Sequence, residues 1–215
     1  PIRSARLPRH AFIGSAVRQE TADPDTMAWL GKPDRRPLVV VSLGTFLSER
    51  VDVLARVAAA LRKVDVRVAM AIGDNDPAAL GEIPNDWLVR PSLAQVTLLE
   101  QAAVLITHGG NNSVTEALTF GVPMLVMPFS TDQFDGAAAV ERNLAGIALD
   151  PNSASRPLIA GAVRGLLRNP PPLPSKLGAG LRADPGPEVA FEAISTLPDL
   201  HTVIPDPRER VAVTS

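Results

Sequence analysis

The sequence predicts an α/β fold, a doubly wound and mostly parallel sheet of about six strands with helices between successive strands. Two observations carry this prediction. Short apolar runs recur along residues 37–149, as expected for strands that are buried on both faces of a parallel sheet. Between these runs, apolar residues recur three and four positions apart, which is the helical period. Alternating strands and helices indicate βαβ units, and therefore a parallel sheet.

The first unit is the clearest. A strand is expected over residues 37–43, where the run PLVVVSL ends at Gly44. A helix is expected over residues 48–61, because its apolar residues have helical spacing, and a second strand over residues 66–72. This order of strand, helix and strand is the basic βαβ unit.

The same alternation continues toward the carboxyl end. Further strands are expected over residues 87–89, 104–107, 123–127 and 146–149. The intervening helices are expected over residues 95–101, 112–119 and 132–143. Trp87 is interpreted as a core residue at the start of its strand.

The two ends of the chain lack this alternation. Residues 1–36 contain several prolines between short polar and apolar pieces, and we expect an extended lead-in without a core element. The domain is predicted to span residues 37–197, with a helix over 155–167, a proline-rich break at 169–174 and two more helical stretches. The tail, residues 198–215, is expected to be poorly ordered or docked on another part.

Composition excludes several classes of protein. The 215 residues are 46% hydrophobic and 20% charged, which argues against a disordered chain, and no apolar run approaches the roughly 18 residues that span a bilayer. The absence of cysteine excludes disulfides and thiolate metal sites. A net charge of -2, with six phenylalanines, two tryptophans and no tyrosine, argues against a nucleic-acid partner. Without a recognisable signal peptide, a cytoplasmic location is expected.

Residues suited to anion binding follow the strand at 104–107. The turn His108-Gly109-Gly110 leads into a helix that we expect Asn112 or Ser113 to cap. Ligands bind beyond the carboxyl ends of strands in open α/β sheets, and helix N-termini attract anions. The glycines permit close approach and the polar side chains can donate hydrogen bonds, so the turn suits a diphosphate. A purely structural turn would use the same residues.

The sequence beyond this turn resembles a known family. The segments THGGNNSVTEAL (107–118), GVPM (121–124) and DQ (132–133) resemble the donor-binding signature of GT-B nucleotide-sugar glycosyltransferases, both bacterial natural-product and macrolide enzymes and plant secondary-product enzymes. SLGT (42–45) is similar to the donor loop of that family. The resemblance covers roughly residues 8–197. It implies the C-terminal, Rossmann-like half of a GT-B fold, with residues 1–36 as an interdomain linker.

The resemblance also implies roles for individual residues. The diphosphate would be bound by Thr45, His108, Gly110, Asn112 and Ser113. The nucleoside would be bound by Ser92, Leu93, Gln95 and Glu116, and the donor sugar by Asp132 and Gln133. The residue types fit, because a carboxylate accepts hydrogen bonds from a diol and an Asp-Gln pair offers acceptors and donors to sugar hydroxyls. Ser92 stands where the family often has a stacking aromatic ring, so uridine and thymidine both remain open.

By this resemblance, the chain is the donor-binding domain of an inverting, metal-independent glycosyltransferase. The whole enzyme would transfer a sugar or deoxysugar from a TDP or UDP donor to a small natural-product acceptor. Its partners would be the nucleotide sugar and its own N-terminal acceptor domain, with no membrane partner, no cofactor and no metal. No catalytic residue is expected within the chain, since the general base would lie in the acceptor domain and His10 and His201 fall in the linker and the tail. The chain alone should therefore be inactive.

Two alternatives remain for the function. One is a non-catalytic module that binds a nucleotide sugar. The other is a sugar-nucleotide epimerase or a lipid-linked GlcNAc transferase of the same fold.

Asp74-Asn75-Asp76 matches a metal-binding Asp-x-Asp pattern, but its neighbours Gly73 and Pro77 favour a turn.

Overall fold

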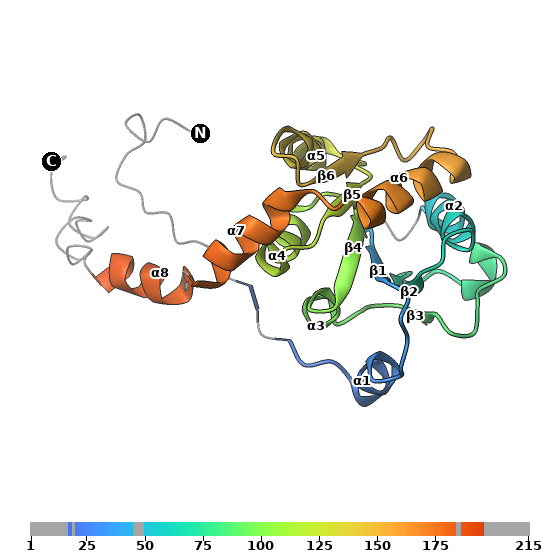
Figure 1. Ribbon diagram of the computed structural model, residues 1–215, viewed down its shortest axis with the longest axis horizontal. Helices are drawn as coiled ribbons and strands as arrows, with labels where there is room; N and C mark the ends of the chain where they lie inside the picture. Colours follow the sequence, from blue (N-terminus) through green and yellow to red (C-terminus); the bar gives the residue numbers. More distant parts are fainter. Residues whose placement is uncertain (1–16, 19, 45–49, 184–185, 196–215) are drawn as a thin grey trace, which may run out of the picture. The chain divides into compact units, whose positions relative to one another are not determined.

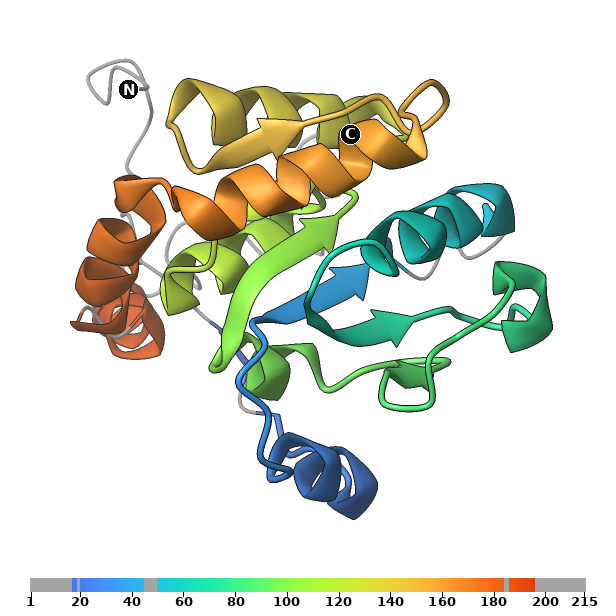
Figure 2. The same cartoon turned by 45° about the vertical axis from the view of Figure 1, so that its right-hand side comes forward.

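The computed structural model describes residues 17–18, 20–44, 50–183 and 186–195. In this part of the chain, six strands form one parallel sheet in the order β3-β2-β1-β4-β5-β6 (Figures 1 and 2). The strands are β1 (Leu38–Ser42), β2 (Arg67–Ala71), β3 (Leu88–Arg90), β4 (Ala102–Thr107), β5 (Met124–Val126) and β6 (Gly146–Ala148). The predicted doubly wound parallel sheet is confirmed.

Apart from the first, the helices occur close to where the sequence predicts them. They are α1 (Pro24–Leu30), α2 (Val51–Leu61), α3 (Gln95–Leu99), α4 (Asn111–Phe120), α5 (Thr131–Arg142), α6 (Arg156–Arg168), α7 (Pro172–Ala183) and α8 (Gly186–Ser195), with a short 3-10 helix, η3, at Pro77–Leu80. Helix α7 begins inside the predicted break at residues 169–174, because proline is tolerated in the first turn of a helix. Residues 17–182 form one compact unit, whereas α8 belongs to a second unit.

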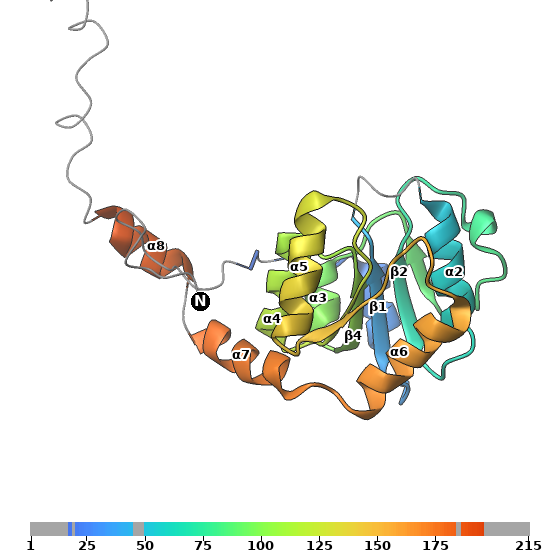
Figure 3. The ribbon, with the colours of Figure 1, turned by 90° about the horizontal axis from the view of Figure 1, so that it is seen from above.

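Helices cover both faces of the sheet (Figure 3). Helices α2 and α6 pack on one face, and α1, α3, α4 and α5 contribute to the apolar cluster on the other. Strand β1 shows why its first four residues are all apolar. Val39 and Val41 belong to the first cluster, and Leu38 and Val40 belong to the second. Trp87 is buried in the first cluster, as predicted.

Residues 24–30 contradict the prediction of an extended lead-in without a core element. Helix α1 forms there because the Asp23 side chain caps its first turn, accepting hydrogen bonds from the Thr26 N–H (3.0 Å) and hydroxyl (2.6 Å). Pro24 occupies the first turn, where its missing N–H has no cost. Trp29 and Leu30 are buried in the core. The linker role of residues 1–36 stays a prediction.

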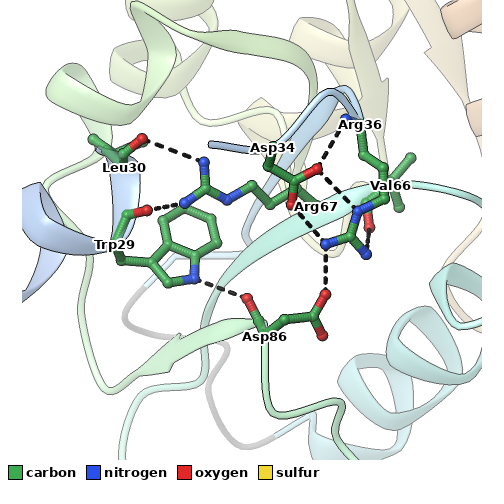
Figure 4. Close-up of polar contacts among 7 residues, drawn as sticks. All are labelled: Trp29, Leu30, Asp34, Arg36, Val66, Arg67 and Asp86. Carbon is green, nitrogen blue, oxygen red and sulfur yellow. Dashed lines mark hydrogen bonds and ion pairs between the residues drawn. The ribbon is translucent and has the colours of Figure 1, made fainter. Parts of the chain in front are cut away.

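Helix α1 is attached to the sheet through Arg67, the first residue of β2 (Figure 4). The Arg67 guanidinium carbon lies 3.7 Å from the centroid of the Trp29 ring, and its nitrogens donate to the carbonyl oxygens of Trp29 and Leu30. The Trp29 indole in turn donates to the carbonyl oxygen of Asp86 at 2.8 Å. Next to this contact, Arg36 pairs with Asp86 and Asp34, which lowers the pKa of Asp34 to about 2.

Candidate functional site

A pocket of about 560 Å³ opens at the carboxyl ends of the central strands. Its walls come from the residues at and after the ends of β1, β2, β3 and β4 and from the N-terminal parts of α2, α3, α4 and α5. The sheet order reverses between β1 and β4, so the connections that leave these two strands diverge. The pocket therefore lies at the switch point of the sheet, where open α/β proteins bind ligands.

Most of the predicted site residues line this pocket. They are Ser92, Leu93, Gln95, His108, Gly110, Asn112, Ser113, Glu116 and Gln133. Thr45, predicted to contact the diphosphate, lies outside the described residues. Asp132 is exposed on the first turn of α5 and is not among the residues that line the pocket. Whether these residues bind a donor remains a prediction.

The start of α4 differs from the prediction that Asn112 or Ser113 caps it. Gly110 is the N-cap residue, and no side chain among the described residues caps the helix. Gly109 has a φ of 89°, a left-handed conformation that favours glycine and turns the chain from β4 into the helix. The first N–H groups of α4 are therefore left to other acceptors, and Asn112 and Ser113 line the pocket at this end of the helix. This arrangement attracts anions.

The His108 ring packs against Gly44 and Gly110. A Cβ atom on Gly110 would lie 2.5 Å from His108 Nε2, and one on Gly44 would lie 3.0 Å from the ring, so a larger residue at either position would displace the ring. Burial lowers the pKa of His108 below its ordinary value of 6.5, although the charge of Asp132 and a hydrogen bond with the Ser42 backbone oppose this shift. The lowered pKa favours the neutral imidazole, which has a single N–H. That N–H can donate to the Ser42 carbonyl or, when a ligand occupies the pocket, to the ligand.

A buried polar network joins α3 to α4. The Gln95 side-chain amide donates to the Glu116 carboxylate at 2.6 Å and to the Ser113 hydroxyl at 3.2 Å. Gln95 and Glu116 are only 7% and 6% exposed, so both side chains are held in place. The bond from Gln95 uses Oε2 of Glu116, which leaves Oε1 to accept a hydrogen bond from a ligand hydroxyl.

The side-chain amide oxygen of Gln133 is already engaged in hydrogen bonds with the backbone. Its Oε1 accepts hydrogen bonds from the backbone N–H groups of Phe129 (2.9 Å) and Ser130 (3.2 Å), as in a capping box at the start of α5. The side-chain NH₂ group is the end that remains for a sugar hydroxyl. Within the Asp-Gln pair, Gln133 would then supply the donor and Asp132 the acceptor, and the binding of a sugar by this pair stays a prediction.

Sequence reasoning missed several residues of the pocket wall. Arg18, Gly73, Pro91 and Asn111 also line it. Gly73 follows a predicted strand, so the rule that ligands bind beyond strand ends could have identified it. Arg18 lies in the supposed lead-in, and no local pattern in the sequence marks it.

The described residues contain no group of three or more His, Asp or Glu side chains that could hold a metal ion. The Asp74 to Asp76 segment forms the turn before η3, whose first turn is capped by Asp76. Among the helices of this same part of the chain, none is long and apolar enough to cross a membrane.

The matching family model and two relatives of this chain are all sugar transferases. The family model of the UDP-glucoronosyl and UDP-glucosyl transferases matches residues 5–171. An uncharacterized UDP-glucosyltransferase, YojK of Bacillus subtilis, is 26% identical over 189 residues, 86% of this chain and 46% of the relative. Demethyllactenocin mycarosyltransferase of Streptomyces fradiae is 33% identical over 121 residues, 56% of this chain and 26% of the relative.

A similar fold is found in solved structures. The calicheamicin glycosyltransferase CalG4 matches with a TM-score of 0.75 and 26% identity over 91% of this chain. The match covers 48% of CalG4, so this chain spans about half the length of its relatives. This agrees with the prediction of one half of a GT-B fold.

Proposed function

Because the chain belongs to the UDP-glucoronosyl and UDP-glucosyl transferase family, we propose that it is the donor-binding half of an enzyme that transfers a sugar from a UDP or TDP donor. The acceptor that we propose is a small natural product. Two named relatives support this choice, the mycarosyltransferase and the calicheamicin enzyme.

One observation carries the proposal. The uncapped start of α4 and the buried Gln95-Glu116 pair line the same pocket. The helix start, with His108, is complementary to a diphosphate, and the Glu116 carboxylate is complementary to the two hydroxyls of a ribose. A nucleoside diphosphate presents both groups.

In the reaction that we propose, an acceptor hydroxyl attacks the anomeric carbon as the bond to the diphosphate breaks, through an oxocarbenium-like transition state. Attack from the opposite face inverts the configuration. The first turn of α4 and the neutral His108 stabilise the negative charge on the leaving diphosphate, so we propose that no metal is required. The proton of the acceptor passes to a base on the acceptor domain, outside this chain.

Calorimetric titration of the chain with UDP, TDP and ADP tests the donor site. We expect UDP or TDP to bind, with the same affinity in the presence of EDTA, and ADP to bind more weakly. Glu116→Gln should weaken binding, whereas Glu82→Gln, an exposed glutamate outside the pocket, should leave it unchanged. If neither UDP nor TDP binds at millimolar concentration, the proposal is wrong.

A second measurement separates an enzyme half from a non-catalytic binding module. The chain is joined to the N-terminal half of YojK and incubated with a UDP- or TDP-sugar and a set of phenolic acceptors. We expect product only in the joined protein, not with the chain alone. Donor binding without any transfer in the joined protein, when intact YojK is active on the same acceptors, would favour the binding module.

A further inference from the structure

Glu20 connects the chain before α1 with helix α3. Its carboxylate Oε2 accepts a hydrogen bond from the Val96 N–H at 2.8 Å, and its backbone carbonyl accepts one from the Thr97 hydroxyl at 3.1 Å. These partners are 76 and 77 positions away in the sequence. The Glu20 side chain is 19% exposed, so it is held within the protein rather than in solvent.

Helix α3 depends on this contact because it has no cap of its own. It has five residues, and its N-cap position is Ala94, whose side chain cannot accept a hydrogen bond. The Val96 N–H belongs to the first turn, where helical N–H groups lack partners within the helix. Glu20 supplies the missing acceptor, and its negative charge is favourable at a helix N-terminus.

The residue that begins α3 is Gln95, which reaches the pocket. Its side-chain amide holds the Glu116 carboxylate and the Ser113 hydroxyl through the two bonds described above. A shift or fraying of the first turn of α3 would therefore move Gln95 away from Glu116. The contact of Glu20 with Val96 therefore influences the orientation of Glu116, because the two are connected through the short helix α3 and Gln95.

We propose that Glu20 is a positioning residue for the nucleoside end of the pocket, acting through the first turn of α3 and Gln95. This inference rests on the proposed function. Arg18 pairs with Glu20 at 2.9 Å and lines the pocket, so the same segment also contributes to the wall. Because α1 follows directly and is fixed by Trp29 and Arg67, residues 20–30 are attached to the domain at both ends.

The test compares two ligands in the full 215-residue chain. In Glu20→Ala, the affinity for UDP or TDP should fall about tenfold, as expected for loss of a hydrogen bond to a charged group, while the affinity for inorganic pyrophosphate stays unchanged. Glu20→Gln keeps the acceptor and should recover most of the affinity. Glu82→Ala is the matched control. Equal losses for nucleotide and pyrophosphate would indicate a merely structural role and overturn the proposal.

A double-mutant cycle tests the route through Gln95. Once Gln95 is replaced by alanine, Glu20→Ala should cause no further loss of nucleotide affinity, since its effect has no residue left to act through. Additive losses would contradict that route.

Nuclear magnetic resonance of the ligand-free chain provides a readout that does not need nucleotide binding. Glu20→Ala should shift the side-chain amide signals of Gln95 and the backbone amide signal of Ser113, and leave that of Gly161 in place. If the wild-type chain binds neither UDP nor TDP, the proposed function fails. The resonance measurement still tests whether Glu20 positions Gln95, because it needs no nucleotide. Unchanged Gln95 signals overturn the inference.

Discussion

The guanidinium of Arg67 stacks on the Trp29 ring at 3.7 Å and donates to the carbonyl oxygens at the end of the helix that carries Trp29. Arg67 is 7% exposed, and its burial lowers its pKa without removing its charge. Because the helix is only seven residues long, its position depends on this contact more than on its own helical stability.

Replacing Arg67 by methionine should lower the free energy of unfolding by about 2–4 kcal/mol, since two charge-assisted hydrogen bonds and a cation-π contact are lost. Arg67→Lys keeps the charge but not the planar fork and should recover only part of this loss. Urea unfolding, followed by circular dichroism, measures both. An unfolding midpoint equal to that of the wild type in Arg67→Met would refute this assignment.

Gly110→Ala should weaken nucleotide binding while leaving the fold intact. The backbone at Gly110 is extended and accepts alanine, but the new Cβ would lie 2.5 Å from His108 Nε2 and displace the ring. Loss of one hydrogen bond to a charged ligand predicts a decrease of about tenfold to a hundredfold in UDP or TDP affinity. Gly161→Ala in α6, where a Cβ meets nothing within 4 Å, is the control.

The pH dependence of stability should contain a contribution from His108. Its pKa in the folded protein lies below the ordinary 6.5, so the unfolded chain binds a proton more readily. The stability that neutral His108 contributes is complete above pH 6.5 and is lost as the pH falls toward the lowered pKa. Urea unfolding between pH 5 and pH 8 should therefore show a steeper acid-side decrease in the wild type than in His108→Gln. Parallel curves would contradict the shift.

Gly136→Ala should destabilise the protein by about 1–3 kcal/mol, as overpacking does. Position 136 lies on α5, where a Cβ atom would meet the backbone carbonyl oxygen of Gly109 inside van der Waals contact. Backbone cannot rotate aside as a side chain can. Gly165→Ala, at an open position of α6, should instead raise stability by about 0.5–1 kcal/mol. Thermal unfolding of the two variants beside the wild type is the measurement.

The sheet could be predicted because its signal is local. Every residue from Leu38 to Val41 is apolar, and burial on both faces of a parallel sheet requires that. Helix α1 was missed because seven residues are too few for a helical period to emerge. Its start had a signal, Asp23 followed by Pro24, but the burial of Trp29 depends on Arg67, which is 38 positions away.

The candidate site could also be predicted only in part, where its residues lie next to one another in the sequence. Residues 108–116 follow one strand end, so their shared location follows from topology. Residue preference alone places the cap of α4 at Asn112 or Ser113, whereas the turn places Gly110 there. The contact of Glu20 with Val96 joins distant segments, and no spacing rule addresses such a pair.

Helix α4 starts on a glycine, and its first N–H groups are open to an anionic ligand in the pocket. Binding and folding are then coupled, because a ligand that binds only the native state stabilises it by about 2.7 kcal/mol at a hundredfold excess over its Kd. The melting temperature of the chain should therefore rise as more of the pocket is occupied by ligand. A thermal-shift screen of nucleotide sugars can rank donors without knowledge of the acceptor and without any turnover.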